Sequence, residues 1–196
     1  MQEDSKSAKS MFSLIQGFYS YFTHKPSVNI LIIGLDNAGK TTLLEYIKGR
    51  FGKQKSMPND SITPTIGMNI AKFNYDGVQI MLWDLGGQEK MRSIWKEYYT
   101  ESDGVVFVLD STDTSRLQEA RDAFEKACAD ELLMDVPAMI FANKQDLRGA
   151  LDVKGLSSVF NTSSYSKILS VSAITGRGVD EALISLISEA KWHALH

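Results

Sequence analysis

The stretch SVNILIIGLDNAGKT at residues 27–41 joins a short apolar run to a glycine-rich turn. Its first part, residues 27–35, is β-branched and apolar, which is typical of a strand buried on both faces. Gly34–Thr41 fits the pattern G-x-x-x-x-G-K-[ST], and the apolar spacing of residues 43–47 continues it as a helix. A strand, a glycine-rich turn and a helix in this order predict a loop that cradles phosphates at the positive end of the helix.

The rest of the chain repeats the alternation of strand-like and helix-like segments. Apolar runs occur at Gly104–Asp110, Val136–Asn143 and Ile168–Val171, and apolar residues recur at helical spacing over residues 115–133 and 179–192. Because strands that alternate with helices predict crossover units, we expect a doubly wound α/β fold with a mostly parallel sheet.

Residues 68–83 depart from that alternation because they hold two strand-like segments around Asp76-Gly77. This dipeptide suits the positive φ angles of a two-residue hairpin turn. We therefore expect one antiparallel strand pair at an edge of the sheet. The domain is predicted to cover residues 27–196, with residues 1–26 as an appendage.

The composition is that of an ordinary globular protein, with 43% apolar and 23% charged residues among 196. The formal net charge of −3 gives no reason to expect nucleic-acid binding. The one cysteine, Cys128, cannot form an internal disulfide, and its place on the apolar side of a helix predicts a core residue. With no apolar run of 18 residues, we expect a monomer in a reducing, cytosolic compartment. Three histidines are too scattered for a metal site: His24, His193 and His196.

Each part of the glycine-rich loop has a chemical role toward a polyphosphate. Backbone N–H groups of the turn can point inward, Lys40 can place its ammonium on the β- and γ-phosphates, and the Thr41 hydroxyl can ligate Mg²⁺. We expect the nucleotide to contact Gly34, Asp36, Asn37, Ala38, Gly39, Lys40, Thr41 and Thr42.

A second segment suited to phosphate follows the strand-like run Gln79–Trp83. Asp84 closes this run and is placed to hold Mg²⁺ through a bound water. The pair Gly86-Gly87 lets a backbone amide approach the terminal phosphate closely, and the Gln88 side chain can orient an attacking water. Gln88 is therefore the predicted catalytic residue.

A third segment, Asn143–Asp146, follows an apolar strand and is suited to read the base. The carboxylate of Asp146 can accept hydrogen bonds from N1–H and the exocyclic amine of guanine, a donor pair that adenine does not offer. A backbone N–H within Ser172–Ile174 can meet guanine O6. The nucleotide-binding residues predicted here are Asn143, Lys144, Asp146, Ser172, Ala173 and Ile174.

With these motifs the chain resembles the small GTPases of the Arf and Arf-like family. The motifs are GLDNAGKT at 34–41, PTIG at 64–67, WDLGGQ at 83–88, NKQD at 143–146 and SAI at 172–174. Within the family, MFSLIQGFYSYF at residues 11–22 and the long stretch Phe51–Ile66 are most similar to the Arf-related branch.

The resemblance implies a switch between GTP and GDP, with slow, Mg²⁺-dependent hydrolysis of GTP to GDP and phosphate. It makes Thr65 the threonine that reaches Mg²⁺ and the γ-phosphate only in the GTP state, and Gly87 the donor of a backbone N–H to that phosphate. Asp36 would face the same phosphate, where a fixed negative charge disfavours an anionic transition state. Residues 51–67 hold no arginine that could act in cis, so we expect a GTPase-activating protein to insert one.

The resemblance also implies partners and a surface that changes with the nucleotide. We expect an exchange factor, effectors and a membrane surface, with the hairpin at 68–83 sliding in register to expel the N-terminal helix toward the membrane. Trp83 and Tyr98 match aromatic positions of the family's effector surface, whereas Met68 stands where phenylalanine is usual. A plain core role is the alternative for Trp83. Vesicle traffic at the Golgi is the expected setting.

The amino end decides how such a membrane contact would form. Residues 11–22 place apolar and aromatic side chains along one side of a helix, which fits either an interfacial membrane helix or a helix packed on its own domain. Gln2 replaces the glycine that N-myristoylation needs, and a start at Met11 would make residues 1–10 an extension. The basic run from Lys48 to Lys55 is either a solvated loop or a contact for anionic lipid.

Two other functions stay open on the sequence alone. A P-loop kinase would transfer the γ-phosphate to a metabolite, but it leaves NKQD at 143–146 unexplained. A scaffold that binds GTP without hydrolysing it is disfavoured by Gln88, because loss of this side chain is the simplest route to that state.

Overall fold

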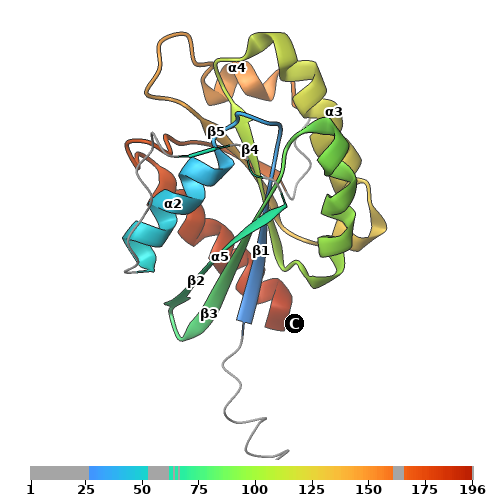
Figure 1. Cartoon of the computed structure of the whole chain (residues 1–196), viewed down its shortest axis with the longest axis vertical. Helices are drawn as coiled ribbons and strands as arrows, with labels where there is room; N and C mark the ends of the chain where they lie inside the picture. Colours follow the sequence, from blue (N-terminus) through green and yellow to red (C-terminus); the bar gives the residue numbers. More distant parts are fainter. Residues whose placement is uncertain (1–26, 53–61, 64, 66, 161–165, 196) are drawn as a thin grey trace, which may run out of the picture.

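A six-stranded sheet forms the centre of the domain in the computed structural model, which describes residues 27–52, 62–63, 65, 67–160 and 166–195 (Figure 1). The strands lie in the order β2-β3-β1-β4-β5-β6. β2 and β3 are antiparallel and the other neighbours are parallel, which confirms the predicted doubly wound α/β fold with an antiparallel pair at one edge. The strand bounds are β1 (Ser27–Ile33), β2 (Met68–Tyr75), β3 (Val78–Leu85), β4 (Gly104–Asp110), β5 (Ala138–Asn143) and β6 (Ser166–Ser170).

The β2–β3 hairpin turns where the sequence predicts it. Asp76 and Gly77 both have positive φ angles, of 48° and 76°, and Tyr75 pairs directly with Val78. The turn therefore has the two-residue geometry that matches the twist of an antiparallel pair.

The helices depart from the sequence prediction at two places. The periodicity over 115–133 predicts one helix, but α3 ends at Cys128, because the Asp130 carboxylate accepts from the Leu132 backbone N–H and starts a short 3-10 turn. η2 and α4 are not predicted, since a 3-10 helix and a five-residue helix leave little apolar periodicity. The bounds are α2 (Lys40–Phe51), η2 (Glu89–Glu101), η3 (Thr114–Arg116), α3 (Leu117–Cys128), η4 (Glu131–Leu133), α4 (Val153–Ser157) and α5 (Val179–Leu195).

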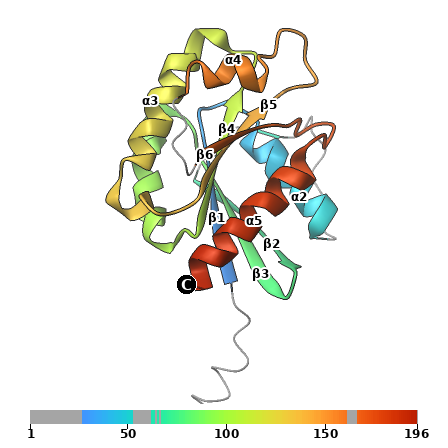
Figure 2. The ribbon, with the colours of Figure 1, turned by 180° about the vertical axis from the view of Figure 1, so that it is seen from behind.

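Helices cover both faces of the sheet, so the protein has two apolar layers. α2 and α5 pack on one face around Leu43, Phe141 and Leu186, and η2 and α3 pack on the other around Phe107 and Trp95. Figure 2 shows α5 crossing the sheet on the face opposite to α3. Residues on β4 and β5 are buried almost without exception, as expected for central parallel strands.

This topology brings the polar motifs to one edge. β2 and β3 lie on one side of β1, and β4, β5 and β6 lie on the other. The strand order therefore reverses at β1. Ligands of open α/β sheets bind beside the carboxyl ends of the strands at such a reversal. The loops after β1, β3, β5 and β6, which carry the predicted nucleotide motifs, all start at that edge.

Some sequence predictions fall outside the described residues. The N-terminal helix at 11–22 and the lysines at 53 and 55 lie there. In the described part of the basic run, Lys48 pairs with Glu45 and Arg50 with Asp180. Within the described ranges, no helix is long and apolar enough to cross a membrane, and no cluster of three or more His, Cys, Asp or Glu side chains could hold a metal ion.

Cys128, the last residue of α3, is half-buried and packs against the apolar layer between α3 and the sheet, as predicted for a core residue. Burial raises the pKa of its thiol to about 11. The thiolate, which is the reactive form, is therefore scarce at neutral pH.

Candidate functional site

The phosphate loop, Gly34–Thr41, follows β1 and leads directly into α2, as the motif predicts. Gly39 in this loop has a φ angle of +94°, and a Cβ there would lie 2.4 Å from the side-chain nitrogen of Asn143. Only glycine allows the loop to approach the base-reading segment this closely.

Lys40 lies at the bottom of this loop and is 6% exposed. Its ammonium donates to the carbonyls of Gly34 at 3.0 Å and Leu35 at 2.7 Å. Burial lowers the pKa of Lys40 to about 8, although the nearby carboxylates of Asp84 and Asp36 raise it. A bound polyphosphate would supply the negative charge that this buried cation needs.

A cavity of about 330 Å³ opens above the loop and collects most of the predicted phosphate-facing residues. A smaller space of about 60 Å³ adjoins it at Gly39 and Thr42, and is lined by the base-reading segments, including Asp146 and Ala173. Ile62 and Thr63 also line the main cavity and are not predicted by any motif. The full lining of the main cavity is Asp36, Asn37, Gly39, Lys40, Thr41, Thr42, Ile62, Thr63, Thr65, Gly87, Gln88, Lys144 and Ile174.

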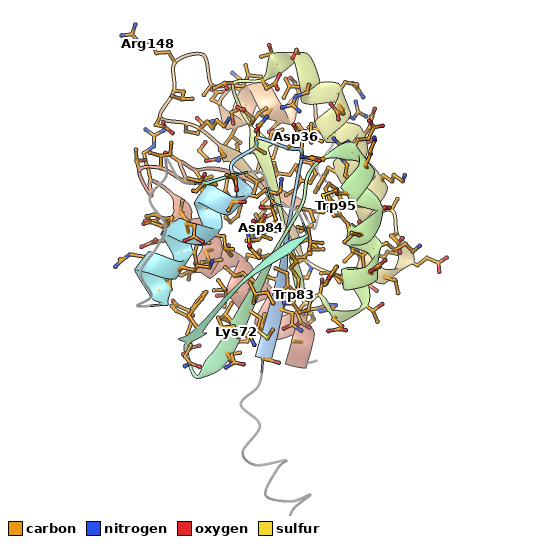
Figure 3. The ribbon with its side chains drawn as sticks, viewed as in Figure 1. Asp36, Lys72, Trp83, Asp84, Trp95 and Arg148 are labelled. Carbon is orange, nitrogen blue, oxygen red and sulfur yellow. The ribbon has the colours of Figure 1, made fainter. Side chains whose placement is uncertain are left out.

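Three side-chain oxygens from separate segments meet beside the cavity. The hydroxyls of Thr41 and Thr65 lie 2.8 Å apart, and Thr41 donates to Asp84 Oδ2 at 2.7 Å. Asn69 on β2 donates to Thr65 Oγ1 at 3.3 Å, a contact that no motif predicts. Figure 3 places Asp84 toward the middle of the domain, and it is fully buried.

The Asp84 carboxylate has a free acceptor. Burial raises the pKa of this carboxyl, against the hydrogen bond from Thr41 and the charge of Lys40. Its second oxygen, Oδ1, is buried without a hydrogen-bond partner among the described residues. An all-oxygen set with one unpaired carboxylate oxygen, next to a phosphate loop, fits the ligand preference of Mg²⁺.

The base-reading segment is held by side chains as well as by backbone. Asn143 donates to the Ala38 carbonyl at 2.8 Å and accepts from the Ala173 backbone N–H at 2.9 Å. Ser172 donates to Asp146 at 2.6 Å, which orients that carboxylate. The predicted residues of both segments therefore form one cluster behind and beside the cavity.

Two unpredicted residues also belong to this cluster. Lys144 pairs with Asp110 at the end of β4 at 2.5 Å. Arg177 donates to the Gln145 carbonyl at 2.9 Å, and it ties the loop after β6 to the loop after β5. Neither Asp110 nor Arg177 belongs to a motif, so only the fold reveals these contacts.

Asp36 has an ion-pair partner that no motif predicts. The sequence expectation points its carboxylate at the γ-phosphate, but in the structure Asp36 Oδ1 accepts from Arg116 Nη1 at 3.0 Å. The same guanidinium donates to the Asp36 carbonyl and to Asp113. Asp36 still lines the cavity, with its charge balanced by Arg116 of η3, which lies outside residues 51–67.

The predicted effector residues divide between surface and core. Met68 is 37% exposed on β2, and its neighbour on the same face, Ile70, is 41% exposed and was not predicted. Trp83 is 6% exposed and packs against Tyr98, with ring centroids 5.7 Å apart. Trp83 thus contributes little surface here and serves as a core residue beneath an apolar edge.

The chain is similar to known proteins over most of its length. A family model described as the ADP-ribosylation factor family matches residues 14–190. ADP-ribosylation factor-related protein 1 of Homo sapiens is 44% identical over 88% of this chain and 90% of its own length, and ADP-ribosylation factor-like protein 3 of Saccharomyces cerevisiae is 40% identical over the same shares. The Arl6 BBS3 small GTPase of Trypanosoma brucei, solved with the nucleotide analogue GppNp, has a TM-score of 0.74 at 28% identity, over 85% of this chain and 99% of that one.

A doubly wound sheet with a phosphate loop and a base-reading segment at its carboxyl edge defines a P-loop GTPase. The chain belongs to the ADP-ribosylation factor family of small GTPases, whose members bind guanine nucleotide and hydrolyse GTP.

Proposed function

We propose that this GTPase is a Mg²⁺-dependent switch that regulates intracellular membrane traffic by binding membranes and effectors according to its nucleotide. The observation that carries the proposal is the meeting of Thr41, Thr65 and Asp84 beside a cavity that Gly87 and Gln88 also line. The segment around Thr65 and the segment around Gly87 thus converge where a γ-phosphate would lie. Both could respond to its presence or loss.

The phosphate loop holds the nucleotide in this proposal. The Lys40 ammonium lies beside the β- and γ-phosphates, and the turn presents its backbone N–H groups to them. The Thr41 and Thr65 hydroxyls and, through water, Asp84 would hold Mg²⁺. When bound, this ion neutralises charge on the β- and γ-phosphate oxygens.

Guanine selectivity depends on Asp146, whose carboxylate is oriented by the Ser172 hydroxyl at 2.6 Å. It accepts from N1–H and the exocyclic amine of guanine, and adenine would leave its oxygens unpaired. Exposed side chains of Leu147 and Ile174 flank the smaller space and can cover the faces of the base.

Hydrolysis requires a water in line with the bond between the γ-phosphorus and the bridging oxygen to the β-phosphate. Gln88 is exposed at the rim of the cavity and orients this water, and the Gly87 N–H stabilises charge on the γ-phosphate. As the water oxygen bonds to phosphorus, the bridging bond breaks and GDP leaves. An activating protein supplies an arginine, worth roughly 10³–10⁵ in rate in other GTPases.

The switch output is the surface around β2. Met68 and Ile70 form an exposed apolar edge that adjoins the segment carrying Thr65. We infer that effectors bind this edge in the GTP state and that residues 1–26 supply a membrane contact, with the Golgi as the setting. The basis for the setting is the similarity to Arf-related proteins.

One experiment tests the proposal against both rivals. Labelled GDP, GTP and ATP are titrated onto the chain and onto Asp146→Asn, and each nucleotide state is then sedimented with vesicles containing anionic lipid. We expect guanine selectivity that D146N loses and greater vesicle binding with a GTP analogue than with GDP. Equal binding of ATP would favour a kinase. GTP that stays uncleaved, even with an arginine-bearing activator, would favour a scaffold.

A further inference from the structure

The indole of Trp95 contacts the Gly86–Gly87 segment on the side that faces away from the phosphate cavity. Trp95 lies on η2, is 3% exposed, and belongs to the apolar layer shared with α3. Its Nε1–H donates to the carbonyl of Gly86 at 3.0 Å (Figure 3 labels the ring). Trp95 is not among the residues that line the phosphate cavity.

This hydrogen bond fixes the orientation of one peptide unit. The Gly86 carbonyl and the Gly87 N–H belong to the same planar amide, and the described residues contain no cis peptide bond. In a trans amide the C=O and the N–H point in opposite directions. By holding the carbonyl on the core side, Trp95 directs the Gly87 N–H to the opposite side, toward the cavity that Gly87 lines.

Neighbouring contacts leave this peptide little freedom. The Gly86 N–H donates to the Gly67 carbonyl at 3.2 Å. Arg92, also on η2, donates from Nε to the next carbonyl, that of Gly87, at 3.0 Å, and its Nη2 pairs with Glu119 on α3 at 2.6 Å. Two consecutive carbonyls are therefore held by η2.

The Gly87 backbone packs closely against the phosphate loop. A Cβ on Gly87 would lie 2.4 Å from Lys40 Nζ and 2.4 Å from the Gly34 carbonyl oxygen. The Gly87 backbone thus lies directly against the phosphate loop. A small rotation of its amide would change which atoms face the terminal phosphate.

We propose that Trp95 is a positioning residue for γ-phosphate recognition, acting through the Gly86–Gly87 peptide. The inference rests on the proposed role of the Gly87 N–H as a γ-phosphate donor. Since GDP has no γ-phosphate, the indole N–H contributes to the binding of GTP and not to that of GDP.

The test compares the affinities of GDP and a non-hydrolysable GTP analogue for the full-length chain and for Trp95→Phe, with Mg²⁺ present. Phenylalanine keeps an aromatic ring in the core but removes the donor. One neutral hydrogen bond corresponds to about a three- to tenfold change in an equilibrium constant. We expect the analogue to bind about three- to tenfold more weakly to W95F, with GDP affinity unchanged. Trp192→Phe, at a 67% exposed position on α5, is the matched control and should leave both affinities unchanged.

A second replacement separates the hydrogen bond from the shape of the ring. 3-Benzothienylalanine at position 95 keeps the two fused rings and replaces the indole N–H by sulfur. The same selective loss is expected with it, including where W95F does not fold. An unchanged ratio of the two affinities, or an equal loss for GDP and the analogue, would overturn the role of Trp95. Wild-type chain that binds neither GDP nor the analogue would instead overturn the proposed function.

Discussion

The side-chain nitrogen of Asn143 donates to the backbone carbonyl of Ala38 at 2.8 Å, across 105 positions of sequence. The oxygen of the same amide accepts from the Ala173 N–H at 2.9 Å. One buried side chain therefore joins the phosphate loop, the loop after β5 and the loop after β6. We therefore expect the affinities for phosphate and base to be coupled through it.

Replacing Asn143 by alanine should loosen both parts of the nucleotide site. Asn143 is 2% exposed, so the change leaves the Ala38 carbonyl and the Ala173 N–H buried without these partners. We therefore expect a loss of roughly 2–4 kcal/mol in unfolding free energy. GDP and GTP should both dissociate faster. Urea unfolding and the release of labelled nucleotide measure the two effects. Asn74→Ala, on the exposed face of β2, should change neither, and a normal GDP release rate in N143A would contradict the coupling.

The sheet was predictable because its strands carry strong local signals. β4 is an unbroken apolar run, and the Asp76-Gly77 turn has the chemistry that a hairpin needs. The helix over 115–133 was predicted too long because apolar spacing continues through Leu132, whereas the Asp130 cap interrupts the backbone. Periodicity reports which side chains are apolar and does not report where a side chain competes for a backbone N–H.

The site was predictable where one motif carries one contact. Thr41 and Asp84 meet because the carboxyl ends of the parallel strands β1 and β3 share an edge. Arg116 and Trp95 were missed, since each acts from a helix that lies beside the site only after folding. A lone arginine or tryptophan has no spacing that could mark its partner.

Removing the Arg116 side chain should weaken nucleotide binding through Asp36. In Arg116→Ala the Asp36 carboxylate loses its counter-ion while it still lines the phosphate cavity. We expect GTP affinity to fall by about tenfold and stability by about 1 kcal/mol or less, since the pair is partly exposed. Titration of labelled GTP measures the first effect.

The double variant Arg116→Ala with Asp36→Asn separates charge from structure. It removes the unpaired carboxylate and should recover most of the lost affinity. If the double variant binds GTP as weakly as R116A alone, the charge of Asp36 is not the cause. Arg121→Ala, which breaks a similarly part-exposed pair with Glu125 on α3, is the control and should bind GTP normally.

The contributions of Cys128 and Tyr99 to stability should fall in alkaline solution because burial makes both side chains ionise late. Burial raises the pKa of the Cys128 thiol to about 11 and that of the Tyr99 hydroxyl to about 12. The folded state then retains protons that the unfolded chain loses between about pH 9 and 12, so its advantage shrinks as pH rises. Urea unfolding is measured at roughly pH 8.5 and 10.5, between the ordinary pKa of a thiol and the raised value of about 11. The fall in unfolding free energy between these two pH values should be about 1–2 kcal/mol smaller in Cys128→Ala than in the wild type. An identical pH dependence would show that the thiol is not responsible.

Gly176 should be intolerant of a side chain because of Tyr46. Its φ angle is +79°, and a Cβ there would lie 2.4 Å from the Tyr46 hydroxyl oxygen, on the helix that follows the phosphate loop. Gly149 has a similar φ angle of +85° but no atom within 4 Å of its Cβ position, so it provides a matched control. Both alanine variants bear backbone strain of about 1 kcal/mol, and G176A must also displace a ring.

We therefore expect Gly176→Ala to lower the unfolding free energy by about 1–3 kcal/mol more than Gly149→Ala. Nucleotide release should also accelerate in G176A alone, because the Gly176 N–H donates to the Ser172 carbonyl and Ser172 holds Asp146. In a Tyr46→Ala background the excess loss should disappear, since the obstructing ring is gone. Equal losses in the two glycine variants would mean that the Tyr46 ring moves aside without cost and that strain alone governs both positions.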